Sequence, residues 1–233
     1  MQVNKNPQAD DIFYPDSDGK PMADNTIQFR WISKLKGATE FLFRSDNQVF
    51  VAGDLLWYPV KGDPKTRVAP DVMVVFGRPK GDRGSYKQWE EEGIAPQVVV
   101  EVLSPSNTVG EMNDKQKFYY DHGVEEFYIL DPITESLWIW QKDEAIAMLY
   151  PQKKEAWVSK RLGIKFAVLE GKLQAFYPDD SPILTYDETK QQALEQQRLA
   201  EEHKQQAEAE RKAKEDALAE IERLKAELHK RSQ

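Results

Sequence analysis

The sequence predicts an α/β protein in which a mixed β-sheet is flanked by helices and followed by a small β extension and a long C-terminal helix. Two short runs, residues 71–76 and 98–103, have the length and the β-branched composition of buried strands. From Tyr186 onward there is no Gly or Pro, and the abundance of Glu, Gln, Lys and Ala is typical of a long helix. We therefore expect one domain at residues 25–185 and a charged helical tail at residues 186–233.

The first part of the chain predicts one helix and two short strands. Residues 1–24 are rich in Asp, Asn, Pro and Gly without periodicity, which indicates an irregular lead-in. Asn25 or Thr26 is suited to cap a helix that continues to about Phe43, because short polar side chains accept hydrogen bonds from the free N–H groups at a helix start. Short strands are expected at residues 49–51 and 55–58.

The second part alternates between strands and helical segments. A loop rich in Gly, Arg and Lys, residues 77–89, follows the first buried strand. After the second buried strand a helix is expected from Gly110 to His122, with Gly123 as its stop signal, and then a strand at residues 127–130. Four further short runs predict a small antiparallel extension: residues 137–140, 146–150, 164–168 and 173–176.

Two acidic residues fall within the predicted buried strands. Asp71 opens the first run directly after a proline, and Glu101 lies among valines in the second. A carboxylate in an apolar strand is costly to desolvate unless a cation compensates it. Two of them on successive strands suggest a shared compensator, for which a divalent metal ion is the natural choice. Lys115 follows on the next predicted helix.

The composition argues against several other kinds of site. The chain has no cysteine, which excludes disulfides, thiolate zinc sites and a cysteine nucleophile. His203 and His229 lie in the tail, so the domain has only His122 to offer to a zinc site or a Ser-His-Asp triad. Before Asp187 there are 28 acidic and 22 basic residues, a balance that weighs against generic, tight binding of nucleic acid.

The distribution of apolar residues gives no sign of export or membrane insertion. The N-terminus lacks an apolar core of signal-peptide length, and no apolar run approaches the roughly 20 residues of a membrane span. We therefore expect a soluble, cytoplasmic protein that does not enter a membrane.

Four ordered motifs carry a resemblance to a known family. They are Val68-Ala-Pro-Asp71-Val, Val100-Glu101-Val-Leu-Ser-Pro105, Lys115 with Tyr119 and Gly123-Val-Glu-Glu-Phe-Tyr128 behind it, and Leu130-Asp-Pro132. Over about residues 25–180 the chain resembles the Uma-two family of restriction endonucleases, which belongs to the PD-(D/E)xK nuclease superfamily. The tail is similar to the coiled-coil appendage of many members.

This resemblance implies a restriction-endonuclease-like core and Mg²⁺-dependent cleavage of DNA, with Mn²⁺ as a substitute. Asp71 and Glu101 would bind one or two metal ions, and Lys115 would orient the attacking water or stabilise the developing charge. The sequence departs from the superfamily pattern at Leu103, which stands where the lysine of E-x-K belongs. Lys115 on the following helix takes that place, and Lys117 is the rival.

The residues alone leave blander interpretations open. Asp71 is also suited to the mouth of a strand after a proline, and Lys115 to a solvent-facing position on a helix. Glu40 is a candidate additional carboxylate or a solvated helix residue. Arg78, Lys80, Arg83 and Lys87 are candidates for phosphate contacts or belong to a mobile, soluble loop.

The remaining polar residues of the motifs predict local structural roles. Ser104 and Ser106 have no partner histidine, so duty in a turn or cap is expected. Asp131 before a proline is expected in a turn, and His122 at the end of its helix is expected to act as a helix-end cation rather than a catalyst.

The tail suggests a second class of function. Its apolar residues Ala217, Ile221, Leu224 and Leu228 follow a 4-3-4 spacing, which is shorter than the three or four heptads typical of a coiled coil. A homo-oligomer, with a dimer favoured, and a single charged helix are both compatible with this pattern. The alternative to a nuclease is accordingly a non-catalytic interaction protein that keeps the fold and works through the tail. Cleavage of RNA or a small phosphodiester is a third possibility.

Overall fold

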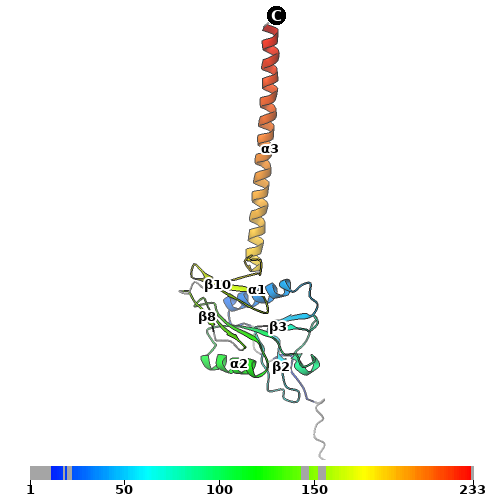
Figure 1. The fold of residues 1–233 in the computed structure, drawn as a ribbon, viewed down its shortest axis with the longest axis vertical. Helices are drawn as coiled ribbons and strands as arrows, with labels where there is room; N and C mark the ends of the chain where they lie inside the picture. The colour runs from blue at the N-terminus through cyan, green and yellow to red at the C-terminus, as the bar shows by residue number, and fades with distance from the viewer. Residues whose placement is uncertain (1–11, 18, 20–22, 143–146, 152–155, 232–233) are drawn as a thin grey trace, which may run out of the picture. The chain divides into compact units, whose positions relative to one another are not determined.

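The computed structural model describes residues 12–17, 19, 23–142, 147–151 and 156–231. Two compact units are present, Met1–Ile183 and Leu184–Gln233. The first is an α/β domain and the second is a helix (Figure 1). Most of the expected lead-in, residues 1–24, and residue 146 of one expected strand lie outside the described residues.

The first unit is built on a six-stranded mixed sheet with the order β1-β3-β5-β6-β7-β8. These strands are Val49–Ala52, Val72–Phe76, Val98–Val102, Glu126–Asp131, Ser136–Gln141 and Ala147–Leu149. The pair β5 and β6 is parallel, and the other neighbours are antiparallel. A parallel pair needs a crossover, and α2 (Val109–Asp121) lies in the connection between β5 and β6. The expected mixed sheet flanked by helices is confirmed.

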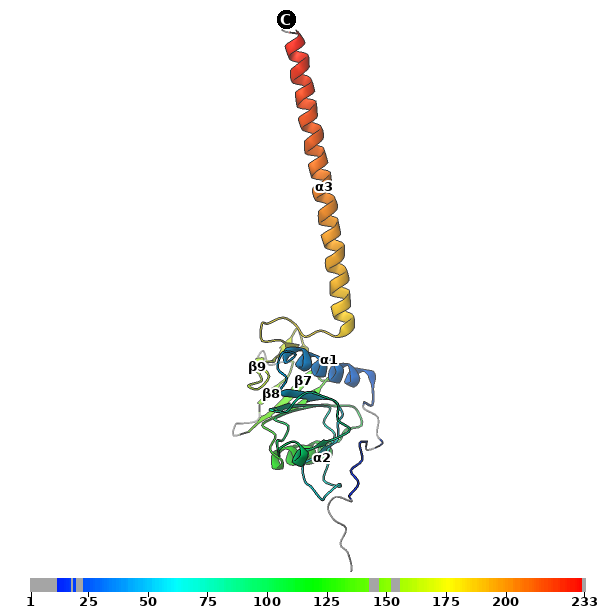
Figure 2. The same ribbon diagram turned by 90° about the vertical axis from the view of Figure 1, so that its right-hand side faces the viewer.

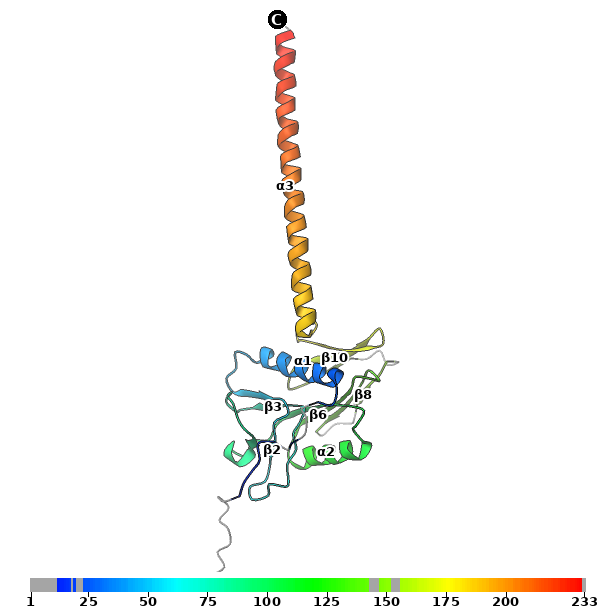
Figure 3. The same cartoon turned by 180° about the vertical axis from the view of Figure 1, so that it is seen from behind.

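Helices cover both faces of the sheet. Figures 2 and 3 show α1 (Thr26–Leu42) on one face and α2 on the opposite face. The strands β3 and β5 lie between them, and all five residues of β5 are buried. Strands that are covered on both sides become continuous apolar runs rather than alternating ones, which explains the valine-rich segments of the sequence.

Two apolar cores result from this layering. One core joins the α1 face of the sheet to a small antiparallel sheet with the order β11-β10-β9, formed by Lys172–Phe176, Lys165–Leu169 and Ala156–Val158. The other core contains Tyr119 of α2 and the aromatic pair Trp57 and Tyr86. The expected β extension is therefore present, but β7 and β8, which were predicted as part of it, pair with the central sheet because β7 has a six-residue register with β6.

Side chains fix the ends of both helices. The Asn25 side chain accepts hydrogen bonds from the backbone N–H groups of residues 27 and 28, so Asn25 rather than Thr26 is the N-cap of α1. Thr108 and Glu111 form a capping box, and α2 begins at Val109, one residue before the predicted start. Gly123 adopts φ +97°, a left-handed conformation that favours glycine, and ends α2 as predicted.

The segment between residues 53 and 90 differs most from the prediction. The expected strand at 55–58 is reduced to β2 (Trp57–Tyr58), which pairs in parallel with β4 (Tyr86–Lys87). A 3₁₀ turn, η2 (Gln88–Glu90), follows β4. This two-stranded sheet was missed because its pairing joins residues about 30 positions apart, a distance over which local patterns carry no information.

A buried carboxylate fastens the small sheet to the central one. Glu126 at the start of β6 is 1% exposed. It accepts hydrogen bonds from the Tyr128 hydroxyl at 2.7 Å, the Ser159 hydroxyl at 2.5 Å and the Arg161 backbone N–H at 2.9 Å. The carboxylate is thus satisfied by donors from the sheet and from the segment between β9 and β10.

The second unit consists of α3 (Tyr186–Arg231), a helix of 46 residues. Its described side chains are exposed throughout and include Leu218, Ile221, Leu224 and Leu228. Ion pairs at i,i+4 spacing, such as Arg198 with Glu202, support the helix from within. Among the described residues, no helix is long and apolar enough to cross a membrane.

We expect the first unit to fold without α3. The described side chains of α3 are exposed, whereas Ile183, just before it, is 1% exposed. Truncation after residue 186 should change the melting temperature of the domain by no more than about 3 °C, measured by near-ultraviolet circular dichroism. Loss of the cooperative transition in the truncated protein would contradict this expectation.

Candidate active site

Asp71, directly before β3, and Glu101 in β5 lie at neighbouring positions of two adjacent strands. Val72 of β3 pairs with Val100 of β5 in the antiparallel register, and each acid is the next residue beyond this pair. Both side chains are withdrawn from solvent, with Asp71 9% and Glu101 2% exposed. The register of two adjacent strands therefore brings two carboxylates together inside the domain.

Burial and the neighbouring charge make Asp71 hard to ionise. Its Oδ2 accepts a hydrogen bond of 2.7 Å from the backbone N–H of Val102. This bond favours the charged form, but desolvation and the Glu101 carboxylate outweigh it and raise the pKa of Asp71 to about 8. In the absence of a cation, Asp71 therefore holds a proton at neutral pH.

Helix α2 supplies two groups that hold Glu101. The Nζ of Lys115 lies 2.7 Å from Glu101 Oε2, and the Tyr119 hydroxyl donates to Oε1. Lys115 and Tyr119 are four residues apart, so both project from one face of the helix. Burial lowers the pKa of Lys115, but the charges of Glu101 and Asp71 outweigh it and leave that pKa above its usual value. Burial and Glu101 also hold the pKa of Tyr119 well above its usual range.

The rival lysine points elsewhere. Lys117 is exposed and forms an ion pair with Asp121 one turn further along α2. Of the two candidate amines, the structure places only Lys115 against Glu101.

A hydrogen-bonded chain from α1 supports the peptide after Glu101. The Gln28 Nε2 donates to the Val102 carbonyl at 2.8 Å, and the Gln28 Oε1 accepts from the Asp24 N–H at 2.8 Å. Gln28 is buried, and the sequence analysis missed it. The available signal was its position on the same helical stripe as Ile32 and Leu35, where a polar residue needs a buried partner.

The serines after β5 have a structural role. Ser104 and Ser106 both donate to Asp24 Oδ2, with 2.5 Å for the Ser104 bond. The Ser104 N–H also donates to Asn107 Oδ1 at 2.9 Å, which closes the turn before α2. The predicted turn duty is confirmed, and the two hydroxyls additionally tie this turn to the segment before α1.

The side chains of Gln28, Asp71, Glu101 and Lys115 line an acidic cleft of about 440 Å³. Acidic side chains outnumber basic ones along its walls. The acids are Asp24, Asp54, Asp71, Glu101, Glu111 and Asp114, and the bases are Arg67 and Lys115. Such a cleft attracts cations and repels anions unless a cation is bound first.

Asp71 and Glu101 offer oxygen donors to a divalent ion. Within the described ranges no group of three or more His, Cys, Asp or Glu side chains is arranged to hold a metal ion. Mg²⁺ is nevertheless commonly bound through one or two carboxylates while it keeps several waters. Burial and the neighbouring Glu101 raise the pKa of Asp71, and a divalent ion beside the two carboxylates would favour its charged form.

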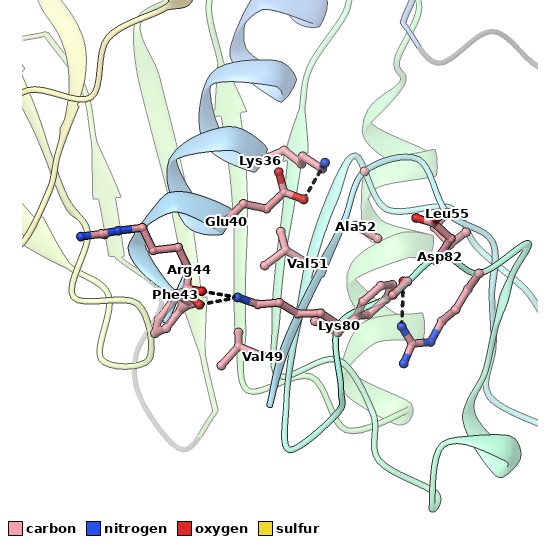
Figure 4. A pocket seen from close by; sticks show the side chains of 14 residues that line it. Lys36, Glu40, Phe43, Arg44, Val49, Val51, Ala52, Leu55, Lys80 and Asp82 are labelled. Atoms are coloured by element: carbon pink, nitrogen blue, oxygen red, sulfur yellow. Dashed lines mark hydrogen bonds and ion pairs between the residues drawn. The ribbon is translucent and has the colours of Figure 1, made fainter. Parts of the chain in front are cut away.

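A second cavity, of about 500 Å³, lies along the edge strand β1 (Figure 4). Glu40, the candidate additional carboxylate, lines this cavity and pairs with Lys36 at 2.7 Å, so it does not contribute to the acidic cleft. Lys80 donates to the carbonyls of Phe43 and Arg44. Lys36, Glu40 and Lys80 of this cavity are thus engaged with partners in the domain.

The basic residues of the 77–89 segment are also engaged. Arg78 and Arg83 both pair with Glu91, at 2.9 and 2.6 Å, and their side chains are only 12% and 13% exposed. The Nζ of Lys87 lies 3.7 Å from Glu90 Oε1. The ion pairs with Glu91 fix both guanidinium groups on the domain. Arg78 and Arg83 therefore do not belong to a mobile loop, and they are not free for phosphate contacts.

The other motif residues lie where local signals placed them. Asp131 Oδ1 accepts from the N–H groups of Ile133 and Thr134, which confirms its turn role. His122 is the C-cap of α2, and its Nδ1 lies 2.8 Å from the Phe118 carbonyl.

The pKa of Asp71 predicts an unusual pH dependence of stability. Between its ordinary value of 3.8 and about 8, native Asp71 holds a proton that unfolded Asp71 has lost, so stability falls as pH rises through this window. In metal-free protein, Asp71→Asn should lack this loss and gain stability relative to wild type between about pH 5 and about pH 9, measured by urea unfolding.

The control is Asp63→Asn, because Asp63 is only partly buried and its Thr66 hydrogen bond lowers its pKa. This substitution should leave the decline of stability at rising pH unchanged. An equal pH dependence of wild type and Asp71→Asn would show that Asp71 is ionised in the metal-free domain.

Comparisons with known proteins give one family match. A family model described as "Uma2: Putative restriction endonuclease" matches residues 18–179. A search of curated proteins finds no match. A crystal structure of "a putative nuclease belonging to DUF820" from Anabaena variabilis ATCC 29413 is 14% identical, with a TM-score of 0.48, and covers 62% of this chain and 77% of that one.

The family match decides the assignment, because the solved structure is too distant to add to it. The matched residues make up most of the chain and include every residue that lines the acidic cleft. The resemblance inferred from the four sequence motifs is therefore confirmed. The chain belongs to the Uma2 family of restriction-endonuclease-like proteins.

Proposed function

We propose that this protein is a metal-dependent endonuclease that hydrolyses DNA phosphodiester bonds in the cleft formed by Asp71, Glu101 and Lys115. The family description supports nuclease activity. The observation that carries the proposal is the contact of 2.7 Å between Lys115 Nζ and a Glu101 carboxylate that shares its cleft with the buried Asp71. A scaffold has no need of two buried acids that oppose each other's ionisation.

Asp71 and Glu101 would hold the metal ion, either Mg²⁺ or Mn²⁺. A bound divalent ion supplies Lewis-acid polarisation of the phosphoryl oxygens and lowers the pKa of a bound water. To act as a ligand, Asp71 must release the proton that it holds in the metal-free state. The Val102 N–H, which donates to Asp71, and the Gln28 amide, which donates to the Val102 carbonyl, would hold the end of β5 in place beside the two carboxylates.

Lys115 would act on the attacking water and on the phosphoryl group. Its raised pKa keeps it protonated at neutral pH, so it serves as a hydrogen-bond donor rather than as a base. The ammonium group orients the water and stabilises the negative charge that develops on the phosphoryl oxygens. The Tyr119 hydroxyl holds the opposite oxygen of Glu101, which fixes the carboxylate to which Lys115 is hydrogen-bonded.

A metal titration tests the carboxylate pair. Mg²⁺ or Mn²⁺ at about one hundred times its Kd should raise the melting temperature of the wild type by about 5 °C or more, since a ligand that binds only the native state stabilises it. Asp71→Ala and Glu101→Ala should respond much less. Glu40→Ala is the matched control, because Glu40 lines the other cavity, and it should respond like the wild type. Equal stabilisation of all four proteins would rule out the site.

A pair of lysine variants tests the catalytic assignment. Lys115→Met keeps the apolar stem and removes the ammonium, so it should reduce DNA cleavage by about a hundredfold or more while the metal-induced stabilisation persists. Lys117→Met should cut at nearly the wild-type rate, because Lys117 is exposed and paired with Asp121. The assignment is wrong if Lys117→Met is the inactive variant.

The exposed apolar residues of α3 favour a second candidate function, a non-catalytic interaction protein that works through this helix. Leu218, Ile221, Leu224 and Leu228 are between 47% and 64% exposed, and they could form a dimer seam or bind another partner. The two functions separate after truncation at residue 186. A nuclease keeps metal-dependent cleavage in the domain alone, whereas an interaction protein has an inactive domain and an isolated α3 that retains partner binding.

A further inference from the structure

An apolar groove of about 360 Å³ lies next to the acidic cleft, between α2 and the strands β6 and β7. None of its lining residues is charged. Its walls combine large apolar side chains with a few amides, which distinguishes it from the cleft on the other side of α2. The face of the sheet that α2 covers is the one opposite α1 (Figures 1 and 2).

Two cross-strand pairs form the apolar floor. Phe127 of β6 pairs with Trp140 of β7, and Ile129 pairs with Trp138. Residues two apart on a strand point to the same face, so all four line the groove together. Both tryptophans are only partly buried. Trp140 packs against the core that contains Phe127 and contacts the Tyr120 ring, so Trp138 is the tryptophan that offers its partly buried ring to a ligand in the groove.

The groove and the cleft share part of their walls. Asn107 and Met112 line both, and Met112 lies one turn of α2 before Lys115. The two compartments therefore adjoin each other at the N-terminal end of α2. The amides of Asn113 and Gln116 lie on the groove side of α2 and offer hydrogen-bond donors and acceptors.

The chemistry of the two compartments matches the two parts of a nucleotide. A phosphate requires the cleft with its lysine and bound cation, whereas a base is an uncharged aromatic plane with hydrogen-bonding edges. The volume is also at the size of a small-ligand site. Because 28 acidic and 22 basic residues precede Asp187, tracking of phosphates contributes little affinity, and stacking of a base can supply it.

We propose that this groove receives an unpaired base of the substrate, next to the phosphate that is held at Asp71, Glu101 and Lys115. A base inside an intact duplex cannot reach such a groove without leaving the stack. The preferred substrate is therefore single-stranded nucleic acid or the single-stranded part of a junction or flap. The proposal rests on the nuclease function above and adds the class of substrate.

Two substitutions test the groove without touching the groups at the phosphate. Trp138→Leu keeps the floor apolar but removes the stacking surface. Val109→Asp places a negative charge at the rim, where Val109 is 79% exposed. An acid in the first turn of a helix is favourable to its dipole, so this variant should fold. Trp31→Phe is the control, since Trp31 packs with the core on the α1 side.

Binding is measured with a fluorescent oligodeoxythymidylate of about eight nucleotides, its duplex with oligodeoxyadenylate, and an oligouridylate of the same length. Ca²⁺ is present as an oxygen-binding cation, and electrophoresis checks that the probes stay intact. The single strand should bind the wild type and Trp31→Phe about tenfold more tightly than the duplex, and Trp138→Leu and Val109→Asp should each lose about tenfold.

Equal affinity for the duplex, or wild-type affinity in both groove variants, would overturn the proposal. Tighter binding of oligouridylate that depends on Trp138 would support the groove and assign it to RNA. A parallel cleavage assay with Mn²⁺ separates the two proposals. Groove-dependent binding without any cleavage contradicts the nuclease function alone, whereas cleavage of single strand and duplex at equal rates by wild type and both groove variants contradicts the groove alone.

Discussion

The domain is organised around two carboxylates that cannot both be charged at low cost. The antiparallel register of β3 and β5 puts Asp71 beside Glu101 inside the protein. A pair of this kind demands donors, and the fold provides the Val102 N–H for one acid and Lys115 with Tyr119 for the other. Burial and the neighbouring Glu101 raise the pKa of Asp71 to about 8, so Asp71 is protonated at neutral pH when no cation is bound.

This demand fixes the position of α2. The helix must hold Lys115 and Tyr119 against Glu101, and aromatic packing holds it there. The Tyr119 ring is parallel to the Trp57 ring, with 6.3 Å between the ring centroids, and the centroid of the Phe127 ring lies 4.9 Å from that of Tyr119. The capping box at Thr108 and the left-handed Gly123 determine where the helix begins and ends. The acidic cleft and the apolar groove are both bounded by α2, so one helix sets the width of both.

The parts that local patterns predict and those that they miss differ in physical origin. The valine-rich strands, the acids within them, the stop at Gly123 and the long C-terminal helix could be predicted, because desolvation cost and helix termination are readable within a few residues. Gln28, Arg78 and Arg83 could not be placed, because their partners Val102 and Glu91 lie in other elements. The β2–β4 pairing escaped for the same reason. The strands alone predicted a shared cation for Asp71 and Glu101, whereas the role of Lys115 was predicted only through the family motifs.

Glu126 provides an internal comparison within the same fold. Like Glu101 it is a carboxylate on a central strand with almost no exposure, and β6 pairs directly with β5. Yet its oxygens are met by two hydroxyls and a backbone N–H, with no second acid among these partners. A buried acid in this fold can therefore be satisfied by neutral hydrogen-bond donors alone, and Glu126 joins the central sheet to the small sheet in this way. The pairing of Asp71 with Glu101 is therefore not a general consequence of burying an acid in this sheet. It is specific to the acidic cleft, whose excess of acidic groups a bound cation would balance.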